Sequence, residues 1–505
     1  MASLPPLAAL FLTHFDDIKG QSVVFYASLP NLPAETIEHT TLPSGLHVLE
    51  SDLVLFEHHD LPGAGLFRSR LSDEGTRGRR MGTLGVVLAS PSVPAELFAL
   101  HDPLSSLFDQ LEQLESSPFA PSTSSKPSSA VSLLAKVWHD NRADAPDTST
   151  TVVKRTGKEP VRGVRQLING TASLPVEHPI AYMPTLLGVL GPSIVPVYKA
   201  ALSGQRILLY STPPLLPLAA FAWCIWAMSI SSATTPVARP SQWLGNVGLM
   251  DLTDVKNRKG GWIATTSDAI YKSHHTVYDV FIDLSSIPIS PTSDVENAPS
   301  TPTPHIVSTY HQPNSTPVPI SYSFSDLPLY RSLLLLTSSP PTVHAGMSKT
   351  GGWWLLAFEL LEQAWKLCVG VCQFAVGKGR VGEEGQFRLD EGEEDASLLG
   401  SEDDFGPETV EEQDQIDEHQ EDEAIRRGKL ILRQLHHNTY HLDAKLRSVL
   451  GSRPRGDAFR TASLNVAEIR ELVGRKWHLG GPEGEDQFWL DVSGKWGMTI
   501  DPNTD

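Results

Sequence analysis

The stretch Lys199–Pro214 reads KAALSGQRILLYSTPP and joins the end of an apolar helix to a strand and a turn. The helix is predicted over Leu186–Leu202, where apolar residues continue for the length of a helix. Gln205–Ser211 is a largely apolar run of strand length, typical of a strand inside a sheet that is covered on both faces. Thr212-Pro213-Pro214 predicts a turn, because proline has no N–H to donate to a strand ladder. The stretch therefore indicates an α/β layer.

A second apolar helix and two more strands follow. Leu215–Ile230 has 16 residues and no charge. At 1.5 Å per residue it spans roughly 24 Å, less than the ~30 Å hydrocarbon core of a bilayer. We therefore expect it to be buried between a sheet and its neighbours and not to cross a membrane. Ile263–Thr266 and Tyr278–Leu284 are predicted as strands of the same layer.

The N-terminus predicts a separate hairpin. Leu10–Phe15 is a predicted strand, Asp16–Gly20 a turn, and Ser22–Ser28 a second strand. Asp16 can accept backbone N–H groups across this turn, and Gly20 can adopt a positive φ that other residues resist.

These motifs occur in an order that resembles the DENN family, and the LCHN branch with its fungal relatives in particular. FD-x-x-x-G between the two N-terminal strands is similar to the opening hairpin of a longin module. KAAL-S-GQRILLYS-PP, followed by GWIATTSDAIY (residues 261–271) and YDVFIDL (278–284), resembles the central DENN domain. The likeness covers roughly residues 5–90 and 176–285, and the C-terminal third only in outline.

The resemblance implies a mixed α/β fold with an N-terminal longin-like sheet and its helices, a central DENN α/β layer, and a mostly helical C-terminal lobe with disordered insertions. Together with composition, it divides the chain as follows: a longin-like module with Ser/Pro-rich loops (1–175), the central DENN domain (176–285), a Pro/Ser/Thr-rich linker (286–319), a helical lobe (320–380), a disordered acidic insertion (383–423), the rest of the helical lobe (424–480) and a tail (481–505).

The resemblance also implies a function, because DENN proteins are known as guanine-nucleotide exchange factors for Rab GTPases. It places a Rab-type GTPase as the partner. The candidate contact residues are those of the longin turn and of the turn after the central strand, namely Asp16, Asp17, Lys19, Thr212, Pro213 and Pro214. Each is equally well explained as a turn former. The other residues that match the family motifs, Phe15, Gly20, Lys199, Arg206 and Ile207, are expected to be architectural.

Charge and cysteine content limit the other functions. The net charge is −19, but residues 383–423 hold nineteen Asp or Glu and one Arg, so the remainder has 40 acidic and 39 basic residues. No domain then carries the basic excess typical of nucleic-acid binding. The acidic block and Pro291–Pro319 have too few apolar residues to pack and are expected to lack regular structure. Three cysteines make no disulfide framework, which favours a reducing compartment. The resemblance implies a cytoplasmic protein that is recruited to endomembranes.

Motifs for bond chemistry are weak, and no cofactor or metal is expected. Gly63-Ala64-Gly65 is interpreted as a loop, since no third glycine follows for a dinucleotide fingerprint. His437 and His441 lie four residues apart without the glutamate of a metalloprotease, and they are interpreted as a solvated helix face. Cys368 and Cys372 have no second ligand pair and are interpreted as core residues. Five arginines lie between candidate strands and are expected at an exposed hairpin tip: Arg68, Arg70, Arg77, Arg79 and Arg80.

Two alternatives to exchange activity stay open at this point. One is a DENN-fold scaffold or adaptor that binds partners without promoting exchange, which long linkers and an acidic block would suit. The other is a small-molecule- or lipid-regulated protein that uses the aromatic-rich segment Trp353–Val376 as an interfacial anchor.

Overall fold

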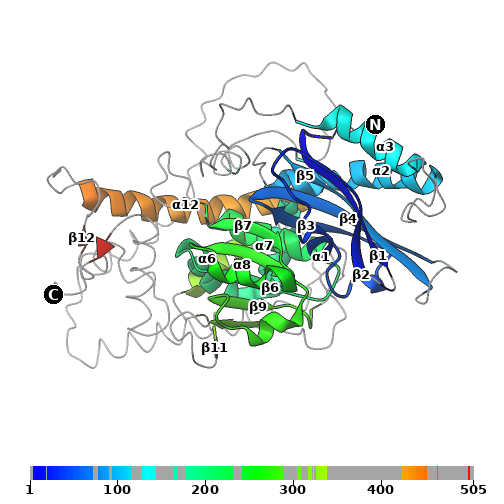
Figure 1. Cartoon of the computed structure of the whole chain (residues 1–505). Helices are drawn as coiled ribbons and strands as arrows, with labels where there is room; N and C mark the ends of the chain where they lie inside the picture. Colours follow the sequence, from blue (N-terminus) through cyan, green and yellow to red (C-terminus); the bar gives the residue numbers. More distant parts are fainter. Residues whose placement is uncertain are drawn as a thin grey trace, which may run out of the picture. The chain divides into compact units, whose positions relative to one another are not determined.

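The computed structural model describes residues 4–16, 18, 20–71, 78–89, 94–114, 128–143, 164, 167, 174–175, 177–230, 241–287, 304–308, 317–320, 322, 326–337, 423–451, 463–464 and 499–500. All of these residues belong to one unit of the chain by their mutual contacts. Its elements are shown in Figure 1.

The N-terminal part forms a five-stranded antiparallel sheet. Its spatial order is β2 (Gly20–Ser28), β1 (Leu7–Asp16), β5 (Arg79–Leu88), β4 (Leu61–Leu71) and β3 (Ser51–His58). The expected hairpin is present as β1 and β2, in which Asp16 pairs with Gly20. One face packs on α2 (His101–Leu114) and α3 (Ser129–Asn141), and the other on α1 (Ile37–Thr41), where Ile37 joins Phe11 and Phe56 in one buried cluster.

The central part forms a six-stranded mixed sheet. Its order is β11 (Val318–Pro319), β10 (His305–Ser308), β9 (Val280–Asp283), β6 (Ile207–Tyr210), β8 (Trp262–Thr266) and β7 (Gln242–Asn246). β9, β6, β8 and β7 are parallel, while β10 and β11 are antiparallel. All four residues of β6 are buried, as expected for a central strand covered on both faces.

Further helices cover the two sheets and connect their strands. They are η1 (Leu46–Val48), η2 (Pro94–Leu100), η3 (Pro179–Tyr182), α5 (Met183–Leu190), η4 (Gly191–Ser193), α6 (Ile194–Leu202), α7 (Leu216–Met228), η5 (Leu249–Asp251), α8 (Leu252–Asn257), η6 (Ala269–Ser273), α9 (Leu327–Thr337) and α12 (Glu423–Gly451). Two short strands, β12 (Ser463–Leu464) and β13 (Thr499–Ile500), pair with each other. The mixed α/β architecture expected from the sequence is confirmed.

The apolar helix α7 is buried along its length, which confirms the expectation of a core helix. Pro179–Leu202 is also long and apolar enough to cross a membrane by length and composition, with a mean hydropathy of 1.6. It is divided into η3, α5, η4 and α6, and half of its apolar window is buried inside the protein. Core helices of water-soluble domains meet the same criterion, so the segment is weak support for a membrane span.

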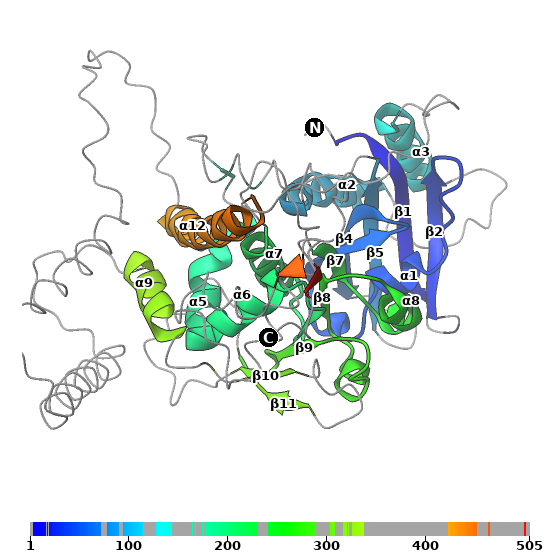
Figure 2. The ribbon, with the colours of Figure 1, turned by 90° about the vertical axis from the view of Figure 1, so that its left-hand side faces the viewer.

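The helices α9 and α12 complete the core of the central part (Figure 2). The Tyr198 hydroxyl donates to the carbonyl of Leu435 at 3.0 Å, and His436 Nε2 lies 2.9 Å from the carbonyl oxygen of Ala227. Lys199 on α6 forms a buried ion pair with Asp326, just before α9. These contacts join segments more than 120 residues apart in the sequence.

The expectation that Pro291–Pro319 lacks regular structure is wrong at two places. His305–Ser308 pairs with β9, and Ile306 and Val307 are buried. Val318–Pro319 then pairs with this added strand. The open edge of β9 supplies ladder partners, which a composition-based argument does not consider. The central sheet therefore extends beyond residue 285.

Two expectations about β4 and β5 are also corrected. Gly63 and Gly65 lie inside β4, not in a loop. Position 63 requires a glycine, because a Cβ there would lie 2.6 Å from the ring of Phe56. Arg68 is buried and donates to Asp109 at 2.6 Å, while its guanidinium lies 4.8 Å from the centre of the Phe108 ring. The arginine therefore holds α2 against the sheet. Arg77 lies outside the described residues.

Candidate interaction surface

The turn between β1 and β2 is held by its own residues. Asp16 Oδ1 accepts the N–H of Ile18 at 2.8 Å, and Gly20 has φ +79°. Ile18 at the tip is 95% exposed. Asp17 and Lys19 lie outside the described residues. The turn therefore presents an apolar side chain from a backbone that Asp16 and Gly20 fix.

The turn after β6 lies beside the segment that follows α1. Thr212 and Pro214 are exposed, Pro213 is half-buried, and the bond between the two prolines is cis. A Cβ on Gly45 would lie 3.2 Å from the ring carbons of Pro213. Gly45 also has φ +91°, so a glycine suits both the backbone and the close approach.

Asp52 joins the N-terminal sheet to the helix α7 of the central part. Its carboxylate, on β3, accepts the N–H of Leu215 at 2.6 Å and that of Leu216 at 3.3 Å, in the first turn of α7. It also accepts the N–H of Leu53 at 2.9 Å. Burial raises the pKa of Asp52 to about 6, although the three N–H groups and the nearby His101 lower it. One buried carboxylate therefore caps the helix that follows the Thr212–Pro214 turn.

Two polar contacts and one close approach place the segment 37–48 between the two parts. Ser267 Oγ donates to the carbonyl of Ser44 at 3.0 Å. On the other side, His39 Nδ1 and Gln21 Oε1 of β2 are 2.8 Å apart. A Cβ on Gly248 would lie 3.9 Å from the carbonyl of His39.

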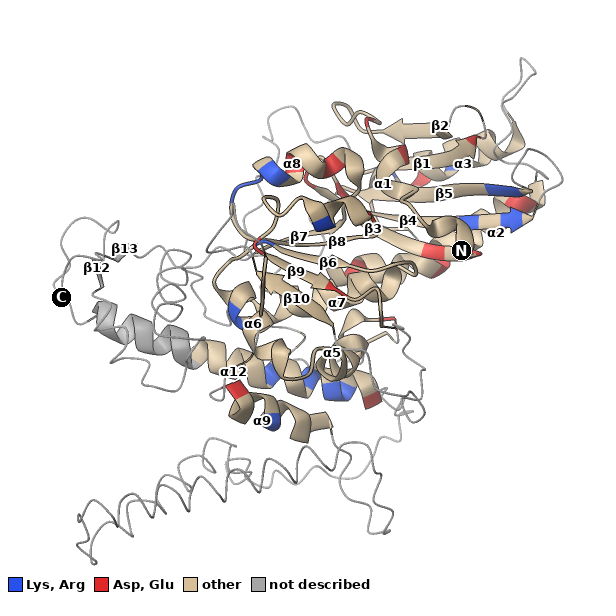
Figure 3. Ribbon diagram, turned by 90° about the horizontal axis from the view of Figure 1, so that it is seen from below, with Lys and Arg blue, Asp and Glu red and all other residues tan. Residues whose placement is uncertain are grey.

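We call this region the seam. It comprises residues 37–48 and the described residues that adjoin them: Asp16, Ile18 and Gly20, which precede Gln21, the turn 211–214, η5 with Gly248, and 267–270. Figure 3 shows α1 between β2 and α8. The seam therefore brings the Asp16 turn and the Thr212–Pro214 turn, which are about 200 residues apart, to either side of one short segment.

The turn η5 carries two exposed apolar residues that sequence reasoning missed. Leu249 is 52% exposed and Met250 is 54% exposed. Asp251 Oδ2 accepts the N–H of Gly248, and Asp268 Oδ2 accepts the N–H of Leu249, both at 2.8 Å. Burial raises the pKa of Asp251, and Asp254 and Asp268 raise it further. The sequence signal was an apolar pair between Gly248 and Asp251.

The remaining motif residues lie in the scaffold. Ile207 is fully buried, and Phe15 is partly buried against the main core. Arg206 pairs with Asp279 at 2.7 Å and so joins the starts of β6 and β9. The buried Lys199 has its pKa lowered by burial, against the opposing effect of Asp326. These side chains fix the framework that positions the seam.

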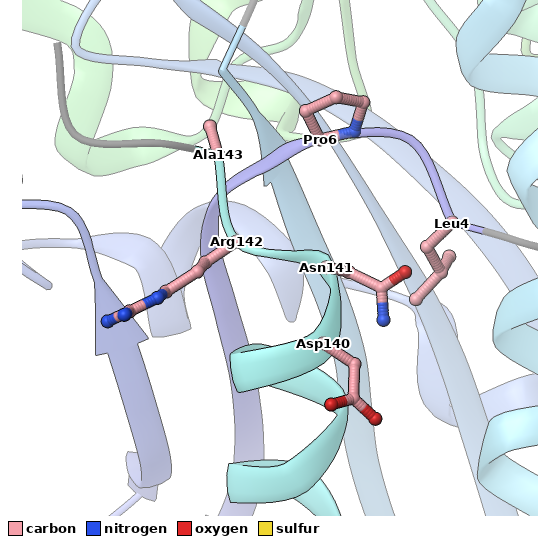
Figure 4. A pocket seen from close by; sticks show the side chains of 6 residues that line it. All are labelled: Leu4, Pro6, Asp140, Asn141, Arg142 and Ala143. Atoms are coloured by element: carbon pink, nitrogen blue, oxygen red, sulfur yellow. The ribbon is translucent and has the colours of Figure 1, made fainter.

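The described residues form a small hollow and no group that could hold a metal ion. A hollow of about 290 Å³ lies at the end of α3, next to the start of β1, lined by Leu4, Pro6, Asp140, Asn141, Arg142 and Ala143. Figure 4 shows Arg142 pointing away from Asn141 and Leu4. The hollow is at the end of β1 opposite to the seam. Among the described residues, no group of three or more His, Cys, Asp or Glu could hold a metal ion.

Comparisons with known proteins agree with this architecture. The family described as DENN domain-containing protein 11 matches residues 10–294, more than half of the chain. The Xenopus laevis protein of that name is 23% identical over 288 residues, which are 56% of this chain and 60% of the relative. The Mus musculus protein is 23% identical over 292 residues, 56% of this chain and 58% of the relative.

A yeast protein extends the matched region. The Saccharomyces cerevisiae protein ANR2 is 21% identical over 378 residues, which are 66% of this chain and 65% of that protein. The chain spans 54 to 60% of the length of the vertebrate relatives. The match over residues 10–294 includes the N-terminal sheet except the first three residues of β1, the four parallel strands of the central sheet and the seam between them. The chain therefore belongs to the DENN domain-containing protein 11 family.

Proposed function

We propose that this chain is a guanine-nucleotide exchange factor for a Rab-type small GTPase and that the GTPase binds at the seam. The observation that carries the proposal is that the segments of the seam carry exposed apolar side chains. Ile18, Val48, Leu249, Met250 and Ile270 are all at least one-third exposed, and they come from both parts of the fold. Apolar patches of this kind on a water-soluble surface are typical of protein interfaces.

Exchange needs no bond chemistry and depends on binding alone. The factor has to bind the nucleotide-free GTPase more tightly than the nucleotide-bound form. Linkage then requires that it weaken nucleotide affinity by the same factor. A rigid surface of standard interface size, about 1,600 Å² in total, is suited to holding the switch loops of a GTPase away from the nucleotide.

The rigidity of the seam supports the proposal. Asp52, the Gly45–Pro213 approach and the Ser267–Ser44 hydrogen bond fix the two parts against each other at three places. A surface that is already ordered loses less conformational entropy on binding, so more of the contact energy remains to distort the partner. We further propose that the protein is cytoplasmic and meets its GTPase at endomembranes.

The test is a panel of purified Rab GTPases loaded with a fluorescent GDP analogue. We expect faster release from at least one Rab when the chain is added, with a rate that saturates as its concentration rises. Binding of each Rab in the nucleotide-free and GDP-bound states is measured in parallel. Binding without faster release would replace exchange by the scaffold function, and no binding to any Rab would reject the GTPase as the partner.

A further inference from the structure

The seam contains one feature with the properties of an interface anchor. Leu249 and Met250 are adjacent, both about half exposed, and form the first two residues of η5. Exposed apolar side chains are common on protein surfaces, but two adjacent ones on a backbone that acidic side chains hold in place are a more specific arrangement.

Two carboxylates fix the backbone under this pair. Asp251 accepts the N–H of Gly248, and Asp268, which follows β8, accepts the N–H of Leu249, both at 2.8 Å. The Tyr271 hydroxyl donates to the carbonyl of Gly248 at 2.8 Å, and Tyr271 itself is fully buried. The turn is thus held by side chains from three places in the sequence, so Leu249 and Met250 are presented in one position.

The surroundings of the pair are acidic. Residues 248–254 contain Asp251 and Asp254 and no Lys or Arg, and Asp268 lies against the same turn. Figure 3 shows the acidic residues of this region on the part of α8 nearer to α1, with a basic residue at the far end of the helix. A partner with an apolar pocket and a basic rim would match both the shape and the charge of this site.

We infer that Leu249 and Met250 are the anchor that inserts into an apolar pocket of the GTPase, with basic GTPase residues facing Asp251, Asp254 and Asp268. This inference rests on the proposed function and adds to it the contact residues and the chemistry of the partner surface. The carboxylates act by positioning the turn and attracting the basic rim, and the two apolar side chains make the buried contact.

The experiment compares the double substitution Leu249→Ala/Met250→Ala with Leu114→Ala/Leu335→Ala. The control removes two apolar side chains that are 51% and 70% exposed, at the end of α2 and on α9. Affinity for each nucleotide-free Rab and the rate of GDP release are measured separately, and melting temperatures verify folding. We expect the first variant to lose at least about tenfold in affinity for the Rab that wild type binds, and the control less than about twofold, since hot-spot residues dominate binding energy.

A second variant tests the charge. Asp254 is exposed on α8, so Asp254→Lys should weaken binding at low salt and much less at about 1 M salt, where the Debye length is about 3 Å. Unchanged affinity in the Leu249/Met250 variant would overturn the anchor while leaving exchange by wild type intact. Loss of binding in that variant without any exchange by wild type would retain the anchor and reject exchange. Absence of all Rab binding would reject both.

Discussion

The substitution Asp52→Asn tests the connection between the two sheets. Asp52 is 7% exposed, and burial raises the pKa of its carboxyl from 3.8 to about 6. Because the pKa is higher in the folded state than in the unfolded state, the folded protein binds this proton more tightly. The contribution of Asp52 to stability is therefore fully present below about pH 4 and is lost as the pH rises through about 6.

The size of the effect follows from the shift. About two pH units correspond to roughly 3 kcal/mol in total. Between pH 8 and pH 5, where the protein can be handled, linkage gives about 1.4 kcal/mol from this group alone. Asparagine cannot titrate, but its oxygen can still accept one of the α7 N–H groups. The stability of wild type relative to Asp52→Asn should thus increase by about 1.4 kcal/mol when the pH falls from 8 to 5.

The assay is urea unfolding followed by tryptophan fluorescence at both pH values, with Asp254→Asn as the matched control on an exposed carboxylate. Among the described residues, His101 lowers the pKa of Asp52 electrostatically, and Asp52 raises the pKa of Tyr182. Asp52→Ala should be worse than Asp52→Asn by about 1–3 kcal/mol, because alanine leaves both α7 N–H groups without this acceptor whereas asparagine still accepts one of them. A wild-type advantage that stays constant or shrinks toward pH 5 would refute the assignment of a raised pKa to Asp52.

Three other predictions concern the seam and the core. Gly45→Ala should destabilise the protein by about 1–3 kcal/mol, because the residue has φ +91° and its Cβ would press on Pro213. The control is Gly78→Ala, where φ is +63° and the space around the Cβ is open. Equal urea midpoints for the two variants would contradict the contact with Pro213. Lys199→Met should lower the free energy of unfolding in urea by about 3–5 kcal/mol, because Asp326 stays buried without the Lys199 cation. The double variant Lys199→Met/Asp326→Leu should recover much of that loss. A double variant as unstable as the single one would refute the ion-pair explanation. Asp16→Lys/Asp17→Lys should lower the rate of exchange on a responsive Rab at least about tenfold, since charged interface groups are worth roughly 2–5 kcal/mol when buried and less at the rim. Asp16→Asn is the control, because it keeps an acceptor for the N–H of Ile18. Exchange by the double variant at the wild-type rate would remove this turn from the interface.

The predicted acidic insertion lies outside the described residues except for its last residue, Glu423. Glu423 was grouped with the acidic block, yet it is the first residue of α12 and its carboxylate accepts from Arg426 and Arg427, each at 2.7 Å. These ion pairs lower the pKa of Glu423 to about 2. A count of charges cannot detect this boundary, because a helix start depends on which residues lie three and four positions further along the chain.

Local pattern was sufficient for the elements whose own residues specify them. The hairpin β1–β2 is encoded by two apolar runs around Asp16 and Gly20, and α7 by an uncharged stretch too short for a membrane span. The strand β6 and its turn follow from ILLY and from the prolines after it. The order of these elements was also enough to recognise the family, because each motif occupies a fixed place in the chain.

Elements that depend on a neighbouring strand or a distant helix could not be predicted from local sequence. The strand β7, with the sequence QWLGN, has little β-propensity and forms because β8 offers its edge, and β10 forms in a Pro-rich region because β9 does. Arg68 was expected on the surface and is buried, since its acceptors Asp109 and Glu112 come from a helix about 40 residues later.

The same distinction applies to the candidate site. The sequence by itself determined the two turns at Asp16–Gly20 and Thr212–Pro214, because φ freedom at glycine and the missing N–H of proline are properties of single residues. Only the tertiary structure decided that both turns lie beside residues 37–48, that Asp52 caps a helix 163 positions away, and that Leu249 and Met250 point outward. Those facts depend on hydrogen bonds and packing between segments that are distant in the chain, and no local pattern records which distant segment a residue will meet.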